Sequence, residues 1–169
     1  MKRLYKNKDN INPVEIIYAS RGIILKDKQI LLTYSNHFQD YTTPGGRMEK
    51  DESLEETLIR ELKEEVGIEK ITFKPIGYID EYCLKNENYI LKKNYYYLIK
   101  TYENGQSNRR KDELNYGMES KWVSIDEAIS QNSKQIKERL EKGLHKDNPF
   151  ITTMIRENHI LTYIKEHYL

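Results

Sequence analysis

The sequence has few of the residues that build disulfides, thiolate metal sites or membrane spans. Cys83 is the only cysteine, which excludes an internal disulfide and a CxxC-type metal site. No run approaches the roughly 18 apolar residues that a membrane-spanning helix needs. The basic start Met1–Lys8 is not followed by an apolar stretch, so we expect no signal peptide. Together these absences favour a cytoplasmic protein that does not insert into a membrane.

Charge and length narrow the class of protein further. Lys and Arg number 28 against 27 Asp and Glu, and the net charge of +1 gives no reason to expect strong non-specific nucleic-acid binding. With 169 residues, of which 33% are charged and 37% hydrophobic, the chain has the size and composition of one folded domain. No repeat, low-complexity segment or shift in composition indicates a second domain.

Hydrophobic periodicity and turn residues predict a mixture of strands and helices. A strand pair is predicted over 14–25 and 29–34, around a turn at Asp27-Lys28. Later segments predicted as strands are 71–82, 95–102 and 121–125. Helices are predicted over about 134–144 and after Asn148-Pro149. Polar segments predicted as irregular are 1–12, 85–94 and 106–113. Because the order lacks regular βα alternation, we expect an α/β (α+β) sandwich with a mixed sheet.

The clearest helix follows the Pro44-Gly45-Gly46 turn. Asp51 or Ser53 can cap its start, and Gly67 stands where a left-handed C-terminal cap would lie. Its apolar residues recur every four positions and give one inward stripe: Leu54, Leu58, Leu62 and Val66. We therefore predict a helix that starts near residue 53 and ends before Gly67.

Three carboxylates project from one sector of this helix. Glu61, Glu64 and Glu65 lie at offsets of 0, 3 and 4, and Glu52 precedes them in the entering loop. Clustered like charges oppose helix formation by about 0.2–0.5 kcal/mol per pair. A hard divalent cation such as Mg²⁺ or Mn²⁺, which prefers carboxylate oxygens, would offset that cost. Taken alone, the three glutamates also fit an ordinary solvated helix face.

The segment Gly46–Ile68, called the box segment below, resembles the Nudix box of the Nudix hydrolase superfamily at every defined position. The matching residues are Gly46, Glu52, Arg60-Glu61-Leu62, Glu64-Glu65 and Gly67-Ile68. Pro44-Gly45 resembles the usual lead-in, and Trp122–Ala128 resembles the segment where many members close. The resemblance covers residues 14 to about 130. It implies a single Nudix domain over 1–169, an α/β/α sandwich with a C-terminal helical extension over about 131–169.

The resemblance also implies an activity and roles for residues. It implies Mg²⁺- or Mn²⁺-dependent hydrolysis of a diphosphate linkage in a nucleoside diphosphate derivative. Residues to which it assigns metal binding are Glu61, Glu64, Glu65 and the carbonyl of Gly46. Glu61 or Glu64 would also orient or deprotonate water, Arg60 would hold the carboxylates, and Glu52 and Gly45 would support the loop.

A general base is expected outside the box segment. Glu113 is the first candidate and Glu119 the second, with an ordinary solvated acid as the alternative for Glu113. Residues considered for contact with the nucleotide are Phe38, Tyr41, Arg21, Tyr95–Tyr97 and Arg109–Lys111. For Tyr95–Tyr97 we expect packing instead, because alternate residues of a strand face opposite sides. For Arg21 we expect a surface ion pair, and for Arg109–Lys111 a solvated loop.

Two functions follow from these observations. The first is a Nudix pyrophosphohydrolase acting on a small nucleotide, with capped or 5′-triphosphate RNA still open as substrates. The second is a Nudix-fold sensor or regulator that binds a nucleotide without turnover. The C-terminal helices are open to three roles: a lid, an extended core or the surface of a homodimer. The box segment encodes diphosphate chemistry only, so it leaves the particular substrate undetermined.

Overall fold

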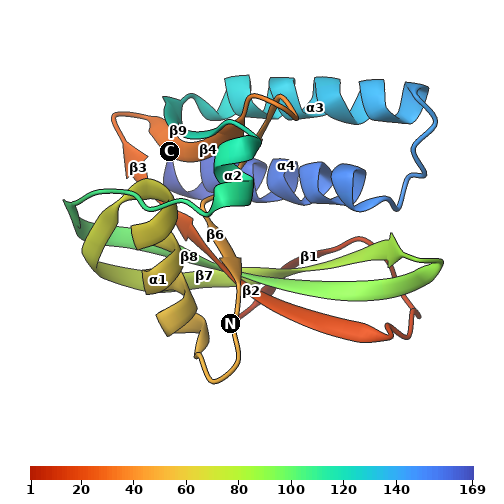
Figure 1. Cartoon of the computed structure of the whole chain (residues 1–169), viewed down its shortest axis with the longest axis horizontal. Coiled ribbons are helices and arrows are strands. Elements are labelled where there is room, and N and C mark those ends of the chain that lie inside the picture. The colour runs from red at the N-terminus through yellow and green to blue at the C-terminus, as the bar shows by residue number, and fades with distance from the viewer.

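The structure, a computed structural model, describes residues 1–169 as two sheets and four helices (Figure 1). The strands are β1 (Arg3–Lys6), β2 (Glu15–Ile23), β3 (Leu25–Lys26), β4 (Gln29–Ser35), β5 (Asp40–Thr42), β6 (Gly45–Arg47), β7 (Ile68–Lys85), β8 (Asn88–Asn104) and β9 (Met118–Val123). The helices are α1 (Leu54–Val66), α2 (Lys111–Asn115), α3 (Ile125–Glu141) and α4 (Pro149–Tyr168).

The larger sheet is mixed, as expected. Its strand order is β1-β7-β8-β2-β6. The pairs β1·β7 and β8·β2 are parallel, whereas β7·β8 and β2·β6 are antiparallel. In the smaller sheet β4 pairs antiparallel with β3, β5 and β9. The chain is therefore a mixed α/β fold with C-terminal helices.

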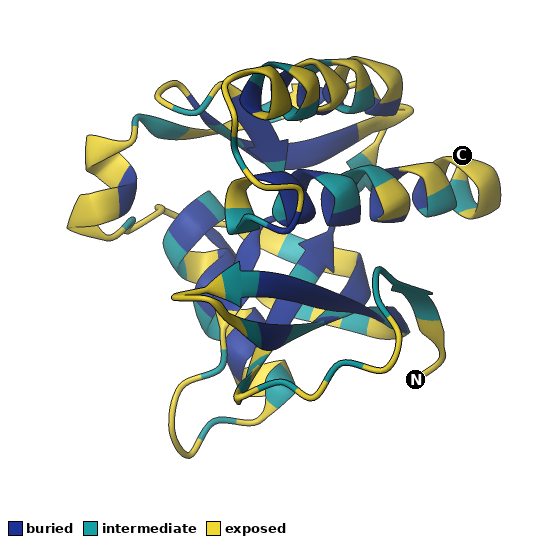
Figure 2. Cartoon of the chain, turned by 90° about the vertical axis from the view of Figure 1, so that its right-hand side faces the viewer, coloured by how far each residue is buried: buried dark blue, intermediate teal, exposed yellow.

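Helices cover the two faces of the larger sheet (Figure 1). On one face α1 buries Leu58 and Leu62 in a cluster that includes Tyr97 of β8. On the other face α4 buries Ile160 in a cluster that includes Tyr96. Tyr96 and Tyr97 thus face opposite sides, which confirms the packing role expected for these tyrosines. Figure 2 shows the buried strands enclosed between helices whose outer faces are exposed.

Several predicted elements are confirmed. The turn at Asp27-Lys28 has positive φ at both residues, and α4 begins at Pro149 with Asn148 as its N-cap. No helix of the structure is both long and apolar enough to cross a membrane.

Other predicted boundaries are wrong because pairing partners lie far away in the sequence. The polar lead-in contains β1, which pairs with Tyr78–Asp80 of β7. The segment 85–94, expected to be irregular, is mostly strand, because Asn86 and Glu87 adopt positive φ and make a two-residue hairpin turn. These long strands form one continuous hairpin, β7–β8.

Two helices also differ from the sequence prediction. The segment 106–113, expected to be a loop, includes the start of α2, so Glu113 lies on a short helix. Helix α3 starts at Ile125, about nine residues earlier than predicted, because the Ser124 side chain accepts a hydrogen bond from the Glu127 amide and caps it. The short strand predicted over 121–125 accordingly ends at Val123.

Candidate active site

Helix α1 is fixed at both ends by interactions within its own sequence. Ser53 Oγ accepts from the Glu56 amide at 3.1 Å, and Glu56 Oε2 accepts from the Ser53 amide at 2.7 Å, which completes a capping box. Gly67 ends the helix with φ 70°. With Leu62 anchored in the core, the rotation of the helix is set and Glu61 and Glu65 are turned inward, both buried.

The lead-in strand β6 lies against these carboxylates, and two glycines make this approach feasible. Gly45 has φ +141°, and a Cβ there would lie 2.0 Å from the Ser20 carbonyl oxygen. Its amide donates to Glu65 Oε2 at 2.9 Å. A Cβ at Gly46 would lie 2.4 Å from Glu61 Oε1. Both positions therefore keep backbone in direct contact with the acidic face of α1.

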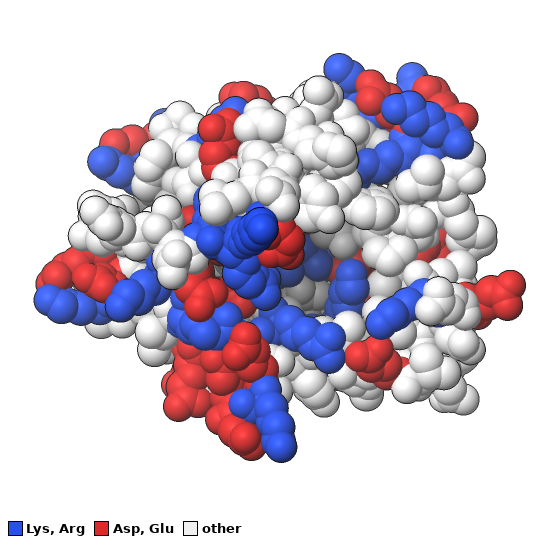
Figure 3. Space-filling view, viewed as in Figure 1, with Lys and Arg blue, Asp and Glu red and all other residues white.

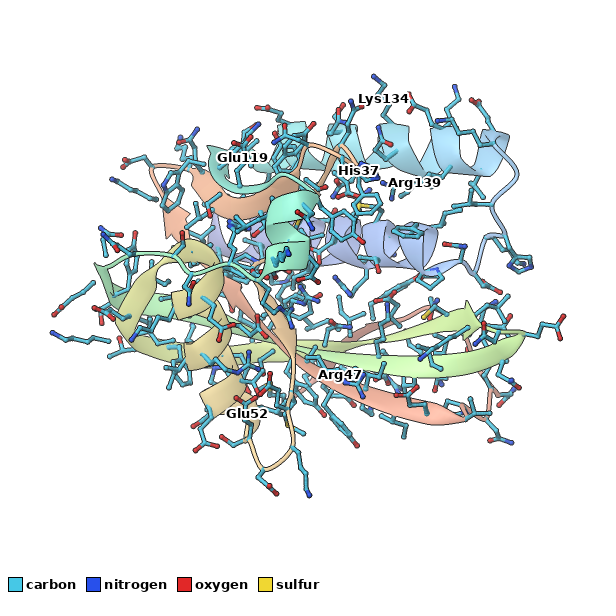
Figure 4. All side chains as sticks on the ribbon, viewed as in Figure 1. His37, Arg47, Glu52, Glu119, Lys134 and Arg139 are labelled. Carbon is cyan, nitrogen blue, oxygen red and sulfur yellow. The ribbon has the colours of Figure 1, made fainter.

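Arg60 lies among three carboxylates of the box segment, those of Glu52, Glu61 and Glu64. Its Nε and Nη2 donate to the two oxygens of Glu52 at 2.6 and 2.9 Å. Its Nη1 donates to Glu61 Oε1 at 2.7 Å and lies 3.5 Å from Glu64 Oε2. Nη2 also donates to the Arg47 carbonyl at 3.1 Å. One guanidinium thus connects α1 to the loop that enters it, and Figure 4 shows Glu52 near the start of α1.

The electrostatics of the site are set by burial and by this guanidinium. Hydrogen bonds from Arg60 hold the pKa of Glu52 at about 2. Burial raises the pKa of Glu61, although Arg60 opposes that shift. Burial also raises the pKa of Glu65 to about 8, against the Gly45 amide and the charge of Arg21. Added positive charge beside Glu61 and Glu65 would therefore be stabilising.

The chemistry of the donors fits a hard divalent cation. Glu61, Glu64 and Glu65 offer carboxylate oxygens, and the Gly46 backbone lies against the Glu61 carboxylate. The present contacts of these groups are to Arg60 and to the Gly45 amide. No three acidic, histidine or cysteine side chains converge at the spacing of metal ligands. These contacts use one oxygen of Glu61 and one oxygen of Glu65, so the second oxygen of each carboxylate would be left for a cation.

Of the two candidate bases outside the box segment, the structure brings only Glu113 toward the carboxylates. Glu113 is buried, and its charge contributes to the raised pKa of Glu65. It accepts from the Arg110 amide at 2.8 Å, so α2 fixes its direction. Glu119 is exposed on β9 and pairs with Lys121 at 2.9 Å (Figure 4). Glu113 is the better-placed acid.

Three residues considered for contact with a nucleotide have clear positions. Arg21 makes no surface ion pair; its Nη1 donates to the carbonyls of Thr43 and Gly45 at 3.0 and 3.3 Å. Tyr41 is 6% exposed and belongs to the core, which removes it from the surface. Phe38 is half-buried and packs against Tyr116, with ring centroids 5.0 Å apart.

Sequence reasoning missed a buried ionic cluster that ties α4 to the lead-in of the box segment. This ionic cluster consists of Arg156, Glu157 and Glu81, each 2% exposed or less. Arg156 donates to Glu81 at 2.7 Å and to Glu157. Glu157 accepts from the Thr43 amide at 2.9 Å and from its hydroxyl at 3.2 Å. Burial opposes ionisation of Glu81, but the charges of Arg156 and Lys92 outweigh it and lower its pKa.

One signal in the sequence could have indicated this cluster. Arg156-Glu157 lies within a helix whose other buried positions from Ile151 to Ile164 are apolar except for Thr152. Charges at such positions must be paired when buried. The partners Glu81 and Thr43 are distant in sequence, so the pairing itself was not predictable.

Comparisons with known proteins identify the family and the fold of the chain. A family model described as NUDIX domain matches residues 18–145. The solved structure of the mutator MutT protein from Bacillus halodurans is similar with a TM-score of 0.55 and 22% identity, over 78% of this chain and 84% of that one. The NUDIX hydrolase from Nitrosomonas europaea gives 0.51 and 20%, over 88% and 90%. The E. coli ORF135 protein gives 0.51 and 24%, over 69% and 79%. These structural similarities concern the fold, and the family model spans the box segment.

Proposed function

Since the chain belongs to the Nudix family, whose model matches residues 18–145, we propose that it is a Mg²⁺- or Mn²⁺-dependent pyrophosphohydrolase. Its substrate would be a small nucleoside diphosphate derivative. The observation that carries this proposal is the arrangement of four carboxylates of the box segment around the Arg60 guanidinium. These carboxylates, called the acidic set below, belong to Glu52, Glu61, Glu64 and Glu65. Glu52, Glu61 and Glu64 lie within 3.5 Å of Arg60, and Glu65 binds the adjacent Gly45 amide.

Each residue of the acidic set has a role in this proposal. Glu61, Glu64, Glu65 and the Gly46 carbonyl would hold the divalent cation. When bound, the cation would neutralise diphosphate oxygens and lower the pKa of the attacking water. Arg60 would hold the side chains of Glu52 and Glu61 in place, so that the carboxylates are positioned before the substrate arrives.

Glu113 is proposed as the group that takes the proton from the attacking water. It is buried on an element outside the box segment, and its charge acts on Glu65. Glu113→Gln keeps an oxygen that can accept from the Arg110 amide, so α2 should remain folded. We expect kcat to fall by about 10²-fold, as for loss of a general base. Asp112→Asn, an exposed acid on the same helix, is the matched control. Full turnover by Glu113→Gln would remove this residue from the mechanism.

The reaction itself is tested with a panel of substrates. The panel holds nucleoside triphosphates, ADP-ribose, nucleotide sugars, dinucleoside polyphosphates and 5′-triphosphate RNA, each assayed with Mg²⁺, with Mn²⁺ and with chelator. The proposal predicts chelator-sensitive release of phosphate or of a nucleotide product from at least one member. Metal-dependent binding of a member without any turnover would instead favour a nucleotide sensor, with α3 and α4 as the surface that reports binding.

A further inference from the structure

The C-terminal helix α4 lies outside residues 18–145, the part of the chain that matches the family model. Figure 1 shows it between α3 and the larger sheet. Two charged residues of α4 are buried there, Arg156 with 2% and Glu157 with 0% of its surface exposed. Replacing a buried ion pair by apolar residues of similar volume is often neutral or stabilising. A need for stability alone therefore does not explain these two charges.

Both carboxylate oxygens of Glu157 are directed at the segment that leads into the box segment. Oε2 accepts from the Thr43 amide at 2.9 Å, and Oε1 accepts from the Thr43 hydroxyl at 3.2 Å. Glu157 is thus the partner of both donors of a fully buried residue. Figure 3 shows acidic side chains gathered at the surface over α1, whereas Glu157 has no exposed surface with which to touch a cation or a substrate. Any action of Glu157 on the site therefore passes through Thr43.

The carboxylate of Glu157 is itself held in place by Arg156. Nη2 of Arg156 donates to Glu157 Oε1, and Nη1 donates to Glu81 Oε2 on β7 at 2.7 Å. The other oxygen of Glu81 accepts from the Thr152 hydroxyl of α4 at 2.7 Å. A continuous chain of hydrogen bonds therefore runs from the larger sheet through α4 to Thr43.

Helix α3 makes a similar contact two residues earlier in the chain. Strand β5 pairs with β4 on one edge and has no strand on its other edge. Asn132 of α3 is fully buried, accepts from the Tyr41 amide at 2.8 Å and donates to the Tyr41 carbonyl at 3.0 Å. Asn132 and Glu157 thus take the place of a neighbouring strand for the backbone of residues 41–43.

The position of Thr43 is transmitted to the proposed metal site over three residues. The carbonyls of Thr43 and Gly45 both accept from Arg21 Nη1, at 3.0 and 3.3 Å. Pro44 lies between them, and its ring fixes φ at about −65°, so it absorbs little of a shift at Thr43. The next residue after Gly45 is Gly46, whose carbonyl is a proposed ligand. A rearrangement at Thr43 would therefore displace that carbonyl.

We propose that Glu157 is a positioning residue for the metal site. By holding the amide and the hydroxyl of Thr43, it sets the place of the Gly46 carbonyl beside the carboxylates of α1. This inference rests on the proposed function, and it adds to that function a requirement for α4, a helix outside the matched residues.

The test compares two variants that each remove one carboxylate charge from the surroundings of Arg156. Glu157→Gln disturbs the bonds to Thr43, because its carboxamide has one oxygen for the three donors that Glu157 now serves. Glu81→Gln is the matched control, since it leaves the contact between Glu157 and Thr43 in place. Binding of Mn²⁺ to the full chain without substrate is measured from the paramagnetic resonance signal of free Mn²⁺. Turnover of the best panel substrate is measured against Mg²⁺ concentration.

Glu157→Gln should raise the Kd for Mn²⁺ about tenfold, as loss of a group that orients a metal ligand typically does. The Mg²⁺ concentration for half-maximal turnover should rise by a similar factor, while KM for the substrate at saturating Mg²⁺ stays within twofold of wild type. Glu81→Gln should keep both metal constants within twofold, although urea unfolding should show that both variants are destabilised. Thr43→Val keeps the shape of the side chain and removes only the hydroxyl, so it should raise both metal constants about threefold. It decides the question alone if Glu157→Gln does not fold.

Three results would overturn the inference: Glu157→Gln or Thr43→Val variants that bind Mn²⁺ like wild type, an equal loss of Mn²⁺ affinity in Glu81→Gln, or a wild type that binds no Mn²⁺. The same measurements separate the inference from the proposed function. Weaker Mn²⁺ binding by Glu157→Gln, with no panel substrate turned over by wild type, would refute the hydrolase and keep the positioning role. Turnover by Glu157→Gln with the Mg²⁺ dependence of wild type would refute the positioning role and keep the hydrolase.

Discussion

Alanine at Gly46 should impair catalysis far more than folding, because of what its Cβ would meet. The new carbon would lie 2.4 Å from Glu61 Oε1 and 2.5 Å from Glu61 Cδ. An ordinary contact needs at least 3.4 Å, so the carboxylate must move by about 1 Å. Gly46 has no positive φ, and its backbone therefore accepts alanine without strain. The carboxylate lies at the end of a flexible side chain and can yield.

The expected magnitudes follow from that displacement. A misplacement of about 1 Å in a catalytic constellation costs on the order of 10²-fold in rate. The change in stability is smaller. It removes at most the charged hydrogen bond from Arg60 to Glu61, worth about 1.5–3 kcal/mol. Alanine adds back about 0.4–1 kcal/mol to the free energy of unfolding, because it lowers the conformational entropy of the unfolded chain. The free energy of unfolding should thus fall by about 1–2 kcal/mol.

Two assays separate these effects: kcat on the best substrate of the panel, and urea unfolding. Gly77→Ala is the matched control, because its Cβ would meet the Lys2 carbonyl oxygen at 2.6 Å and Leu4 Cγ at 2.7 Å, where β7 lies beside β1 and outside the box segment. It should lower stability while the folded fraction keeps its kcat. Turnover by Gly46→Ala within threefold of wild type, or an equal loss of activity in both variants, would contradict the displacement of Glu61.

Two further predictions concern α4 and the loop before it. Glu157→Ala leaves the Thr43 amide without its acceptor and removes one of the two carboxylates that pair with the buried Arg156, so urea unfolding should show a loss of about 3–5 kcal/mol; a loss below 1 kcal/mol would contradict this. Burial opposes ionisation of Asp147, but the Tyr89 hydroxyl and Lys8 lower its pKa. The charge of Asp147 therefore stabilises the fold at pH values above about 3.9, the pKa of an aspartate in the unfolded chain. This stabilisation is lost as pH falls through the lower pKa that Asp147 has in the folded chain. Asp147→Asn should cost about 1–3 kcal/mol at pH 7, and the cost should shrink as pH falls below the unfolded pKa; a cost that does not change over that range would refute the linkage.

Much of the candidate site was predictable because its determinants are local. The cap at Ser53, the left-handed Gly67 and the spacing of Glu61, Glu64 and Glu65 all lie within one helix and its flanks. Helix geometry alone then places the carboxylates in one sector. The Nudix resemblance was confirmed for the same reason, since the residues that carry it are contiguous.

The parts that escaped prediction depend on distant partners. Strand β1 is polar and short, and it exists only because β7 offers a parallel edge. The hairpin turn at Asn86-Glu87 contains no glycine, so its positive φ gave no signal. The position of Glu113 beside Glu65 and the bond from Thr43 to Glu157 arise from tertiary packing across most of the chain. Periodicity and capping say nothing about such contacts.

The most direct test of the central claim is chelator-reversible turnover by the purified chain. Product release from the best panel substrate is measured with Mg²⁺, after chelator, and after Mg²⁺ is restored, for wild type and Glu65→Gln. Wild-type turnover should stop with chelator and return with Mg²⁺, and Glu65→Gln should lose at least about 10²-fold in turnover while remaining folded. Turnover that persists in chelator, or a Glu65→Gln variant as active as wild type, would contradict that claim.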